Sequence, residues 1–245
     1  MCGRFTLRSD PAAIAALFRL GELPSITARY NIAPTQSVGC VLPEAAGERW
    51  TLARWGLLAR WQGNAPASHP LINARSESVS QKPSFRSAFL SRRCLIPCDG
   101  FFEWQMIAGS RRKRPWWITV GQGELTAFAG LYEVQEDGTG PARISCCLLT
   151  TEANALVAPV HHRMPVLIDR EHHNVWLGGT PEAALGLLRP YPAEPMRRVP
   201  VDFAVGNPRH ESPDCVLPVD TPVVGYEVVS GKQAVDEASS PSIRN

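Results

Sequence analysis

The stretch CLIPCDGFFEWQM, residues 94–106, decides the fold that we predict for this chain. Apolar runs on either side of Asp99 predict a strand, a turn and a second strand. The second strand places Glu103 between Phe102 and Trp104, and an acid in such surroundings is costly to bury unless it is paired. Burial would raise its pKa, which suits a general acid or base. The alternative is an outward-facing glutamate on an edge strand.

Apolar segments on both sides of this stretch predict further strands. They cover residues 37–43 and 49–58, which form a hairpin, and residues 115–120, 125–134, 143–150 and the end of 161–168. Irregular segments are expected at residues 28–36, 61–78 and 109–114, of which the last is a basic loop. The pattern predicts a single α+β domain that is rich in antiparallel strands.

Short helices are predicted where capping residues precede apolar segments. They cover residues 9–21, 82–93, 151–158, 169–178 and 180–190. The first helix is expected to begin at Pro11 and to stop at Gly21. The expected N-terminal caps are Ser9 or Asp10 for the first helix, Asp169 and Thr180 for the last two. Residues 229–245 have almost no large apolar side chains, which predicts a disordered tail behind a domain of residues 1–228.

The composition is ordinary for a soluble globular protein, with 44% hydrophobic and 20% charged residues. No apolar run approaches the roughly 18 residues of a membrane span, and no secretory signal is recognisable. The seven cysteines are an odd number without regular spacing. This pattern favours reduced thiols and argues against a structural zinc site. We therefore expect a cytoplasmic protein without a metal or another cofactor.

The net charge is only +2, so the molecule as a whole is not a polycation. Its cations are nonetheless unusual, because 22 are arginines and three are lysines. Arginine offers a planar, bidentate fork that suits phosphate groups. The excess of arginine indicates either phosphate binding or a compositional bias of the genome without functional meaning.

The chain begins MCGRF, and removal of Met1 would make Cys2 the first residue. Cys2 would then carry a free α-amine and a thiol on adjacent carbons, which no internal cysteine can offer. An α-amine has a reference pKa of about 7.7–8.0, against about 10.4 for lysine, so it is neutral far more often at pH 7. The alternative is an ordinary buried thiol near a frayed chain end.

Two other segments hold polar residues that suit a reactive site. In PVHHRMPV, His161 and His162 are adjacent, so an extended backbone would point one inward and the other outward. In LINARSES, Asn73 and Arg75 are two residues apart and share one face of an extended chain. The alternatives are a surface histidine, a turn asparagine and a surface arginine.

Taken in order, these segments resemble the SOS-response-associated peptidase family, also described as the DNA abasic-site cross-linking proteins. The resemblance runs from MCGRF through RYNIAP, WGL, LINARSES, RCLIPCDGFFEW, KRPWWI and AGLYE to HHRMP and AVGN near residue 207. It covers nearly the whole chain before the polar tail. It implies a curved, barrel-like core of mainly antiparallel strands with short flanking helices.

The resemblance also implies four catalytic residues. Cys2 matches the family's N-terminal nucleophile and Asn73 its active-site asparagine. Glu103 matches the acid or base, and His161 matches the catalytic histidine. One departure is His162, which stands where an acidic or amide side chain is usual and changes the surroundings of the catalytic histidine.

The activity that the resemblance implies is the sensing of abasic sites in single-stranded DNA. The α-amine of Cys2 would attack the C1′ aldehyde, and its thiol would then close a thiazolidine that shields the lesion. One alternative is a peptidase with an N-terminal cysteine nucleophile, which includes self-removal of Met1. Weak lyase activity is compatible with either, and a purely non-covalent single-strand binder is a third reading. We expect a monomer that associates with the nucleoid when it is bound to DNA.

Several further residues are candidates for DNA contacts. Arg4 and Arg75 are expected to hold phosphates, with Arg163 and Arg86 beside them. Trp61 is expected either to stack on bases or to pack in the core. Weaker candidates are Arg60 and the basic run RRKR at residues 111–114.

Overall fold

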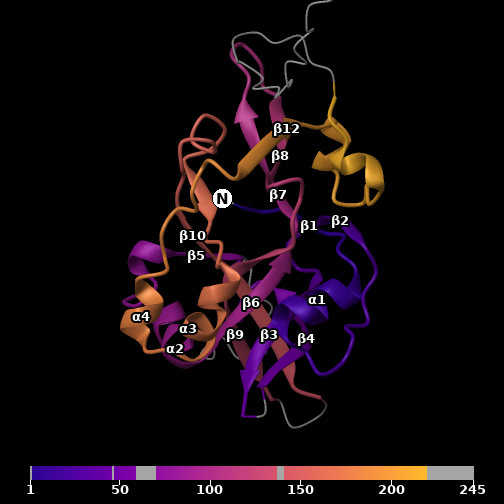
Figure 1. Ribbon diagram of the computed structural model, residues 1–245. Coiled ribbons are helices and arrows are strands. Elements are labelled where there is room, and N and C mark those ends of the chain that lie inside the picture. The colour runs from indigo at the N-terminus through magenta and orange to yellow at the C-terminus, as the bar shows by residue number, and fades with distance from the viewer. Residues whose placement is uncertain (1, 46, 59–69, 137–140, 220–245) are drawn as a thin grey trace, which may run out of the picture.

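Two β-sheets form the frame of the molecule, and the short helices flank one of them (Figure 1). The computed structural model describes residues 2–45, 47–58, 70–136 and 141–219. The first sheet has five antiparallel strands in the order β12 (Met196–Pro200), β8 (Lys113–Val120), β7 (Gly100–Met106), β1 (Phe5–Leu7) and β2 (Arg29–Ile32).

The second sheet closes on itself into a barrel. Its strands are β11 (Arg163–Pro165), β10 (Arg143–Glu152), β4 (Gly47–Trp55), β3 (Ser37–Glu44), β6 (Arg93–Cys98) and β9 (Thr126–Gln135), with β5 (Asn73–Arg75) beside β10. Because β9 pairs with both β6 and β10, the ring β10–β4–β3–β6–β9 has no open edge. Only β4 and β5 run parallel to their neighbour β10, so the predicted barrel-like α+β fold with mainly antiparallel strands is confirmed.

Short helices cover the outside of the barrel. They are α1 (Pro11–Phe18), α2 (Pro83–Ser91), α3 (His173–Gly178) and α4 (Pro181–Leu185), with 3₁₀ turns η2 (Ser76–Ser78), η3 (Arg170–His172), η4 (Phe203–Gly206) and η5 (Pro213–Val216). In Figure 1, α2, α3 and α4 gather on one side and α1 lies on the other. None of the helices in the described part of the chain is both long and apolar enough to cross a membrane.

The stretch 94–106 is where the chain passes from one sheet to the other. The predicted strand, turn and strand are present as β6 and β7, but the two strands do not pair with each other. β6 belongs to the barrel and β7 to the five-stranded sheet, and Asp99 lies between them. A Cβ on Gly100 would come within 2.3 Å of the indole nitrogen of Trp117, so this crossing requires glycine.

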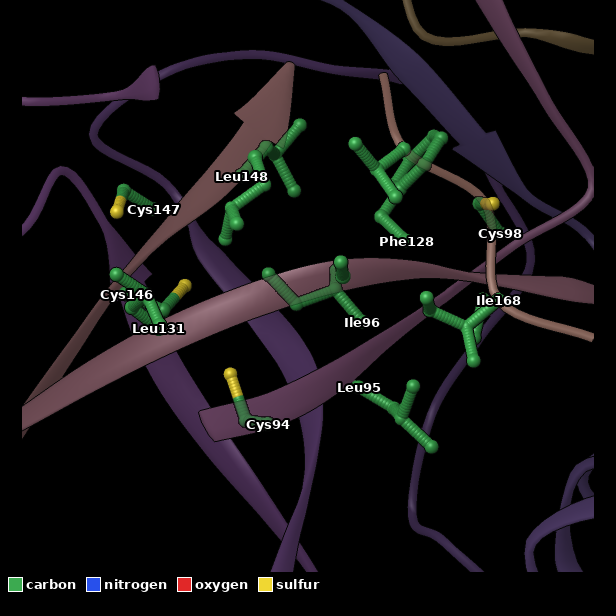
Figure 2. Close-up of a cluster of buried hydrophobic side chains, with 14 of the residues drawn as sticks. Cys94, Leu95, Ile96, Cys98, Phe128, Leu131, Cys146, Cys147, Leu148 and Ile168 are labelled. Carbon is green, nitrogen blue, oxygen red and sulfur yellow. The ribbon is translucent and has the colours of Figure 1, made fainter. Parts of the chain in front are cut away.

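Several strands of the barrel are buried on both faces, apolar and rich in thiols. Buried residues from its strands include Ile96, Phe128, Leu131 and Leu148 (Figure 2). All seven cysteines are free and buried. Cys94, Cys146 and Cys147 lie with these apolar side chains in Figure 2 and behave as small hydrophobic residues.

Several predicted elements differ from the structure. Residues 28–36 were expected to be a loop, yet β2 forms there because the edge of β1 offers backbone partners. A helix was expected at residues 151–158, but β10 extends through Glu152 and turns follow. In those turns the side chain of Asn154 accepts hydrogen bonds from the next backbone amides, which replaces helix formation. The expected basic loop is shorter than predicted, because β8 begins at Lys113.

Helix ends were predicted with mixed success. α1 begins at Pro11 with Asp10 as its cap, and Thr180 caps α4, as predicted. α1 ends at Phe18 and not near Gly21, because Arg19 adopts the left-handed conformation with φ of 51°. The Asp169 side chain caps no backbone amide and instead accepts a hydrogen bond from the hydroxyl of Tyr191.

Candidate active site at the junction of the two sheets

Four candidate residues come from four segments that meet where the sheets join. Cys2 precedes β1 and Glu103 lies in β7, both in the five-stranded sheet. Asn73 begins β5 on the barrel, and His161 precedes β11. The junction therefore assembles side chains that are far apart in sequence.

The Cys2–Asn73 contact joins the start of the chain to the barrel. The side-chain amide of Asn73 donates a hydrogen bond of 2.8 Å to the carbonyl oxygen of Cys2. Cys2 itself is fully buried, and its thiol lies 3.8 Å from the carbonyl oxygen of Arg4. The Oδ1 atom of Asn73 is buried and has no hydrogen-bond partner among the described residues. One acceptor in this site is thus available for a ligand.

Glu103 and His161 form the titratable pair of the site. Nδ1 of His161 lies 4.0 Å from a carboxylate oxygen of Glu103, and the exposed fractions of their side chains are 21% and 3%. Burial raises the pKa of Glu103, and the nearby His162 opposes that shift. Burial lowers the pKa of His161, and its hydrogen bond to the backbone of Arg163 opposes that change. Both shifts favour the neutral forms.

The Cys2 thiol responds to the same surroundings. Burial raises its pKa, and the charge of Glu103 raises it further. The thiol is therefore protonated at neutral pH.

The backbone of Arg163 supports the His161 ring, and its side chain is held by other residues. The Arg163 amide donates to Nδ1 of His161 over 3.0 Å, while the Arg163 carbonyl oxygen lies 3.1 Å from the same nitrogen. The guanidinium group forms a two-pronged ion pair with Glu77 and donates to the Thr150 carbonyl oxygen over 2.6 Å. This ion pair lowers the pKa of Glu77.

The residues that were predicted to contact DNA lie in different environments. Arg75 is exposed on β5, two residues after Asn73. Arg4 is half-buried, and its guanidinium group donates to Asn31 and to the carbonyl oxygens of Val205 and Gly206. These contacts hold η4 against β1 and β2, and phosphate binding by Arg4 stays a prediction.

Arg86 lies on the exposed side of α2, which packs on β6 and β9. No hydrogen bond or ion pair among the described residues joins its side chain to the four candidates. Trp61 and Arg60 lie outside the described residues.

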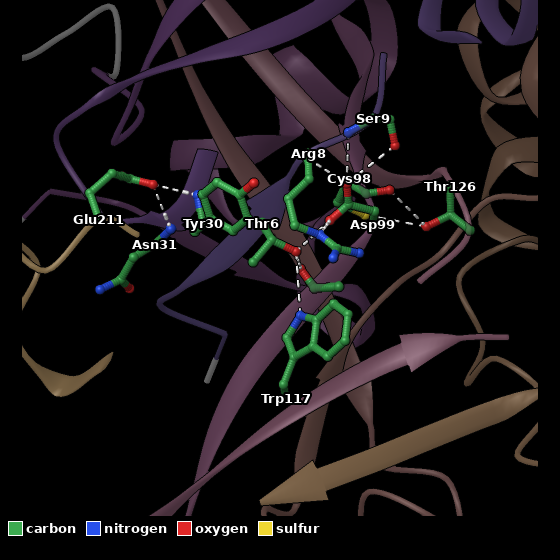
Figure 3. A network of polar contacts seen from close by, with 11 residues as sticks. Thr6, Arg8, Ser9, Tyr30, Asn31, Cys98, Asp99, Trp117, Thr126 and Glu211 are labelled. Carbon is green, nitrogen blue, oxygen red and sulfur yellow. Dashed lines mark hydrogen bonds and ion pairs between the residues drawn. The ribbon is translucent and has the colours of Figure 1, made fainter. Parts of the chain in front are cut away.

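The short strand β1, which follows Cys2, is fastened by Asp99 (Figure 3). The Asp99 carboxylate accepts hydrogen bonds from the Thr6 hydroxyl over 2.6 Å and from the backbone amides of Arg8 and Ser9. Arg8 also forms an ion pair with this carboxylate over 3.1 Å. Asp99, where the chain passes from one sheet to the other, thus fixes the strand that follows Cys2.

Sequence reasoning missed three supporting residues. They are Asn31, which bridges Arg4 to the segment after η4, Glu77, which pairs with Arg163, and Gln105, which is buried on β7. Each lies inside a quoted motif (RYNIAP, LINARSES and GFFEWQM). For Asn31 and Gln105, a polar residue within a strand-forming motif was the available signal, because burial there requires a partner, whereas the exposed Glu77 gave no such signal.

One cluster of the described residues has groups that could hold a metal ion. His210, Asp214 and Cys215 bring their ligand atoms within 4.8 Å of one another. Nε2 of His210 already lies 3.0 Å from a carboxylate oxygen of Asp214, and the Cys215 thiol donates to the His210 carbonyl oxygen over 3.4 Å. These contacts account for the arrangement without an ion, and none of the four candidates belongs to the cluster.

Comparison with known sequences assigns this chain to a family. The sequence model of the SOS response associated peptidase (SRAP) family matches residues 1–208. The chain belongs to the SRAP family. The match spans all four candidate residues of the junction, from Cys2 to His161.

Curated relatives of this SRAP protein carry names that refer to abasic sites. The abasic site processing protein YoqW of Bacillus subtilis is 36% identical over 222 residues, which cover 88% of this chain and 99% of the relative. The abasic site processing protein HMCES of Rattus norvegicus is 28% identical over 210 residues, which cover 73% of this chain. This SRAP chain spans 59% of the length of that HMCES protein.

Solved structures share the SRAP fold of this chain. A protein from Bacteroides thetaiotaomicron superposes with a TM-score of 0.77 at 22% identity, over 89% of this chain and all of the other. A protein from Bordetella bronchiseptica gives a TM-score of 0.71 at 23% identity, over 82% of this chain and all of the other. At these identities the likeness concerns the fold alone.

Proposed function

We propose that this protein recognises abasic sites in single-stranded DNA and links itself to them through Cys2 after Met1 has been removed. The observation that carries the proposal is the junction itself. Asn73 holds the Cys2 carbonyl group, Cys2 is fully buried, and Glu103 lies 4.0 Å from His161. The names of the relatives YoqW and HMCES supply the substrate class.

The reaction that we propose is a condensation of an aldehyde with an aminothiol. The free α-amine of Cys2 adds to C1′ of the open-chain abasic sugar and forms a carbinolamine. Its hydroxyl group takes a proton from Glu103 and leaves as water, so that an iminium ion remains. The thiol sulfur then bonds to C1′ while its proton returns to Glu103. The product is a five-membered thiazolidine, and the only by-product is one water molecule.

The protonation states of the site support this order of steps. A raised pKa keeps the Cys2 thiol protonated, so the amine is the first nucleophile. A raised pKa also keeps the Glu103 carboxyl group protonated at higher pH than in water, as an acid that expels water must be. After that donation, the Glu103 carboxylate is the base that accepts the thiol proton.

Asn73 and His161 have supporting roles in this scheme. The Asn73 amide orients the first residue through its hydrogen bond to the Cys2 carbonyl oxygen. Oδ1 of Asn73, which has no described partner, is an acceptor for the N–H group of the amine or the ring. His161 assists at a sugar hydroxyl or phosphate, and Arg75 holds the neighbouring phosphate.

A Cys2-dependent peptidase is the competing reading. Such an enzyme works best with a thiolate or with a base that deprotonates the thiol directly. Burial and the Glu103 charge both disfavour a Cys2 thiolate. The raised pKa of the Cys2 thiol therefore favours the aldehyde reaction over amide hydrolysis.

Mass spectrometry of the intact protein, with and without abasic single-stranded DNA, tests the proposal. We expect a protein without Met1 and, with DNA, a covalent adduct whose mass is the sum of both partners less one water. Cys2→Ala keeps the α-amine but lacks the thiol, so we expect an imine that survives denaturation only after borohydride reduction.

Matched controls separate the readings. A variant with an N-terminal extension before Cys2 keeps the thiol but loses the free amine, and we expect no adduct from it. An adduct that forms equally well with this extended variant would contradict the proposal. Turnover of casein-like peptides that depends on Cys2, without any DNA adduct, would support the peptidase reading.

A further inference from the structure

Strand β7 carries two buried polar side chains on one face. Glu103 and Gln105 are two residues apart in this strand, so both point the same way. Only Glu103 has a place in the proposed reaction. Gln105 is 8% exposed, and a buried amide of this kind requires partners for both its donor and its acceptor.

The Gln105 amide is satisfied at both ends by different segments. Its nitrogen donates to the carbonyl oxygen of Pro159 over 3.0 Å. Its oxygen accepts from the indole nitrogen of Trp116 over 2.9 Å. Trp116 lies directly opposite Glu103 on β8. An ionised carboxylate could not donate a hydrogen bond to Pro159. A thioether has no donor and is only a weak acceptor for Trp116, so an uncharged amide suits this position.

Pro159 belongs to the turns that carry His161. Two backbone hydrogen bonds converge on the Val157 carbonyl oxygen, from Val160 over 2.8 Å and from His161 over 3.0 Å. These bonds tie Pro159 and His161 into one compact unit between β10 and β11. A second tie runs from the Arg198 guanidinium group to the Leu156 carbonyl oxygen over 2.7 Å.

These contacts give the face of β7 two links to the same unit. Glu103 faces the His161 ring at 4.0 Å, and Gln105 holds the carbonyl group two residues earlier in the chain. The His161 unit contains no regular helix or strand, so anchoring contacts decide where its ring lies. Of the two ties described, only the one from Gln105 comes from the strand face that also presents Glu103.

We propose that Gln105 is a positioning residue, whose amide joins Trp116 to Pro159 and thereby sets the separation between His161 and Glu103. The inference rests on the proposed function, because it assigns Gln105 to the acid–base pair of that reaction. A loss of this tie lets the imidazole move away from the carboxyl group, and a displacement of about 1 Å can reduce a reaction rate by up to a hundredfold.

Two substitutions test the proposal. Gln105→Met has nearly the same volume and removes both hydrogen bonds. Gln105→Glu keeps an acceptor for Trp116 and removes the donor to Pro159. We expect both variants to slow adduct formation by about ten- to a hundredfold. We expect unchanged affinity for abasic single-stranded DNA when the same substitutions are made together with Cys2→Ala.

A second readout follows the His161 ring without any reaction. The titration of His161 is measured by NMR in protein labelled at histidine. Among the described residues, the charged or titratable groups that act on this ring include Glu103 from β7, Lys113 from β8, Arg163 from β11 and the adjacent His162. In Gln105→Met none of these groups is changed, and we expect the His161 pKa to rise toward its value in water because the ring becomes more hydrated.

Gln36→Met is the matched control. The Gln36 side chain also takes part in two hydrogen bonds, in which its oxygen accepts from Arg29 over 2.7 Å and from the Ala33 amide over 3.1 Å, but it lies in the segment between β2 and β3. We expect this variant to keep the wild-type adduct rate and His161 titration. Equal effects of Gln36→Met and Gln105→Met would overturn the assignment, as would a wild-type rate and titration in both Gln105 variants.

The two readouts keep this inference separate from the proposed function. If the wild-type protein forms no adduct, the proposed reaction fails. The titration and a crystal structure of Gln105→Glu still report whether Gln105 places His161. A His161–Glu103 separation that stays at the wild-type 4.0 Å in that structure would refute the positioning role.

Discussion

The carboxyl group of Glu103 illustrates how a single residue acquires its chemistry from its surroundings. Its side chain is 3% exposed, and two of its neighbours along β7 are the aromatic residues Phe102 and Trp104. Burial in this environment raises the pKa of Glu103 and keeps the proton on the acid to higher pH than in water. The same burial lowers the pKa of His161, so the pair is biased toward a neutral acid and a neutral imidazole.

Glu103→Gln tests this assignment. The amide keeps the size of the side chain but cannot transfer a proton, so we expect adduct formation to slow by about a hundredfold or more. In the wild type the acid form disappears as the pH rises through the raised pKa, so the rate should fall there. We expect Glu103→Gln to lack this alkaline decline, measured as initial adduct rates from pH 5 to 9. A decline of equal size in both proteins would contradict the acid role.

At the scale of elements, short strands and helices depend on single polar or aromatic contacts. β1 has only three residues, yet it directly follows the segment that holds Cys2 and lies between β7 and β2. Asp99 holds it through hydrogen bonds to Thr6, Arg8 and Ser9. Charge-assisted hydrogen bonds to buried carboxylates are stronger than neutral ones, so this acid stabilises the junction more than an ordinary turn residue would.

Asp99→Asn should therefore destabilise the fold. Its amide group replaces an acceptor by a donor that faces other donors, and we expect a loss of about 1–3 kcal/mol in the free energy of unfolding. Urea denaturation followed by tryptophan fluorescence measures it. Asp10→Asn is the control, because asparagine caps a helix as well as aspartate does, and we expect little change at the cap of α1. Equal stabilities of the two variants would disprove the role of Asp99.

A second element contact links α3 to α1. The His173 ring stacks on Phe18 with centroids 5.1 Å apart, and its Nε2 lies 3.3 Å from the Ile168 carbonyl oxygen. Burial lowers the pKa of His173 in the folded protein. As the pH falls below about 6.5, His173 takes up a proton more readily in the unfolded chain than in the folded protein. This residue therefore lowers the free energy of unfolding as the pH falls.

His173→Phe should weaken that pH dependence. Phenylalanine keeps an aromatic contact with Phe18 but has no proton to bind. We expect the free energy of unfolding to change less between pH 7 and 5 than in the wild type, by at most about 1.4 kcal/mol per pH unit. Urea denaturation at several pH values measures it. His172→Phe, at the half-buried position beside it, should keep the wild-type slope, and an unchanged slope in His173→Phe would rule out this contribution.

At the scale of the whole molecule, the many arginines do not all serve as a positively charged surface. The net charge is only +2, although the chain has 22 arginines. Several arginines act inside the protein, because Arg4, Arg93 and Arg163 donate to backbone carbonyl groups. Arg75 is exposed on the same strand as Asn73 and is the arginine best placed to meet a phosphate beside the lesion.

DNA binding should accordingly depend on Arg75. In a Cys2→Ala background, which prevents the thiazolidine, we expect Arg75→Ala to weaken binding of abasic single-stranded DNA. We also expect it to reduce the slope of log affinity against log salt by about 1. Fluorescence anisotropy at several salt concentrations measures both quantities. An unchanged slope would exclude a phosphate contact, and Arg86→Ala, measured in parallel, reports whether the DNA surface extends onto α2.

Much of this protein could be predicted from its residues in order. Apolar alternation located β6, β7 and the β3–β4 hairpin, and capping residues located the starts of α1 and α4. Motifs supplied the four candidate residues and the family, and their proposed roles stay predictions. The domain boundary near residue 228 and the character of residues 229–245 also stay predictions, since the latter lie outside the described residues.

Only the tertiary structure decided how these elements meet. It placed β6 and β7 in different sheets, made a strand of Arg29–Ile32, and brought Gln105 to Pro159 and Asn73 to Cys2. Hydrophobic periodicity and capping are local and can be seen within a few residues of sequence. Pro159 lies 54 residues from Gln105, and Cys2 lies 71 residues from Asn73. Strand register and barrel closure decide which such distant residues meet, and neither can be seen within a few residues of sequence.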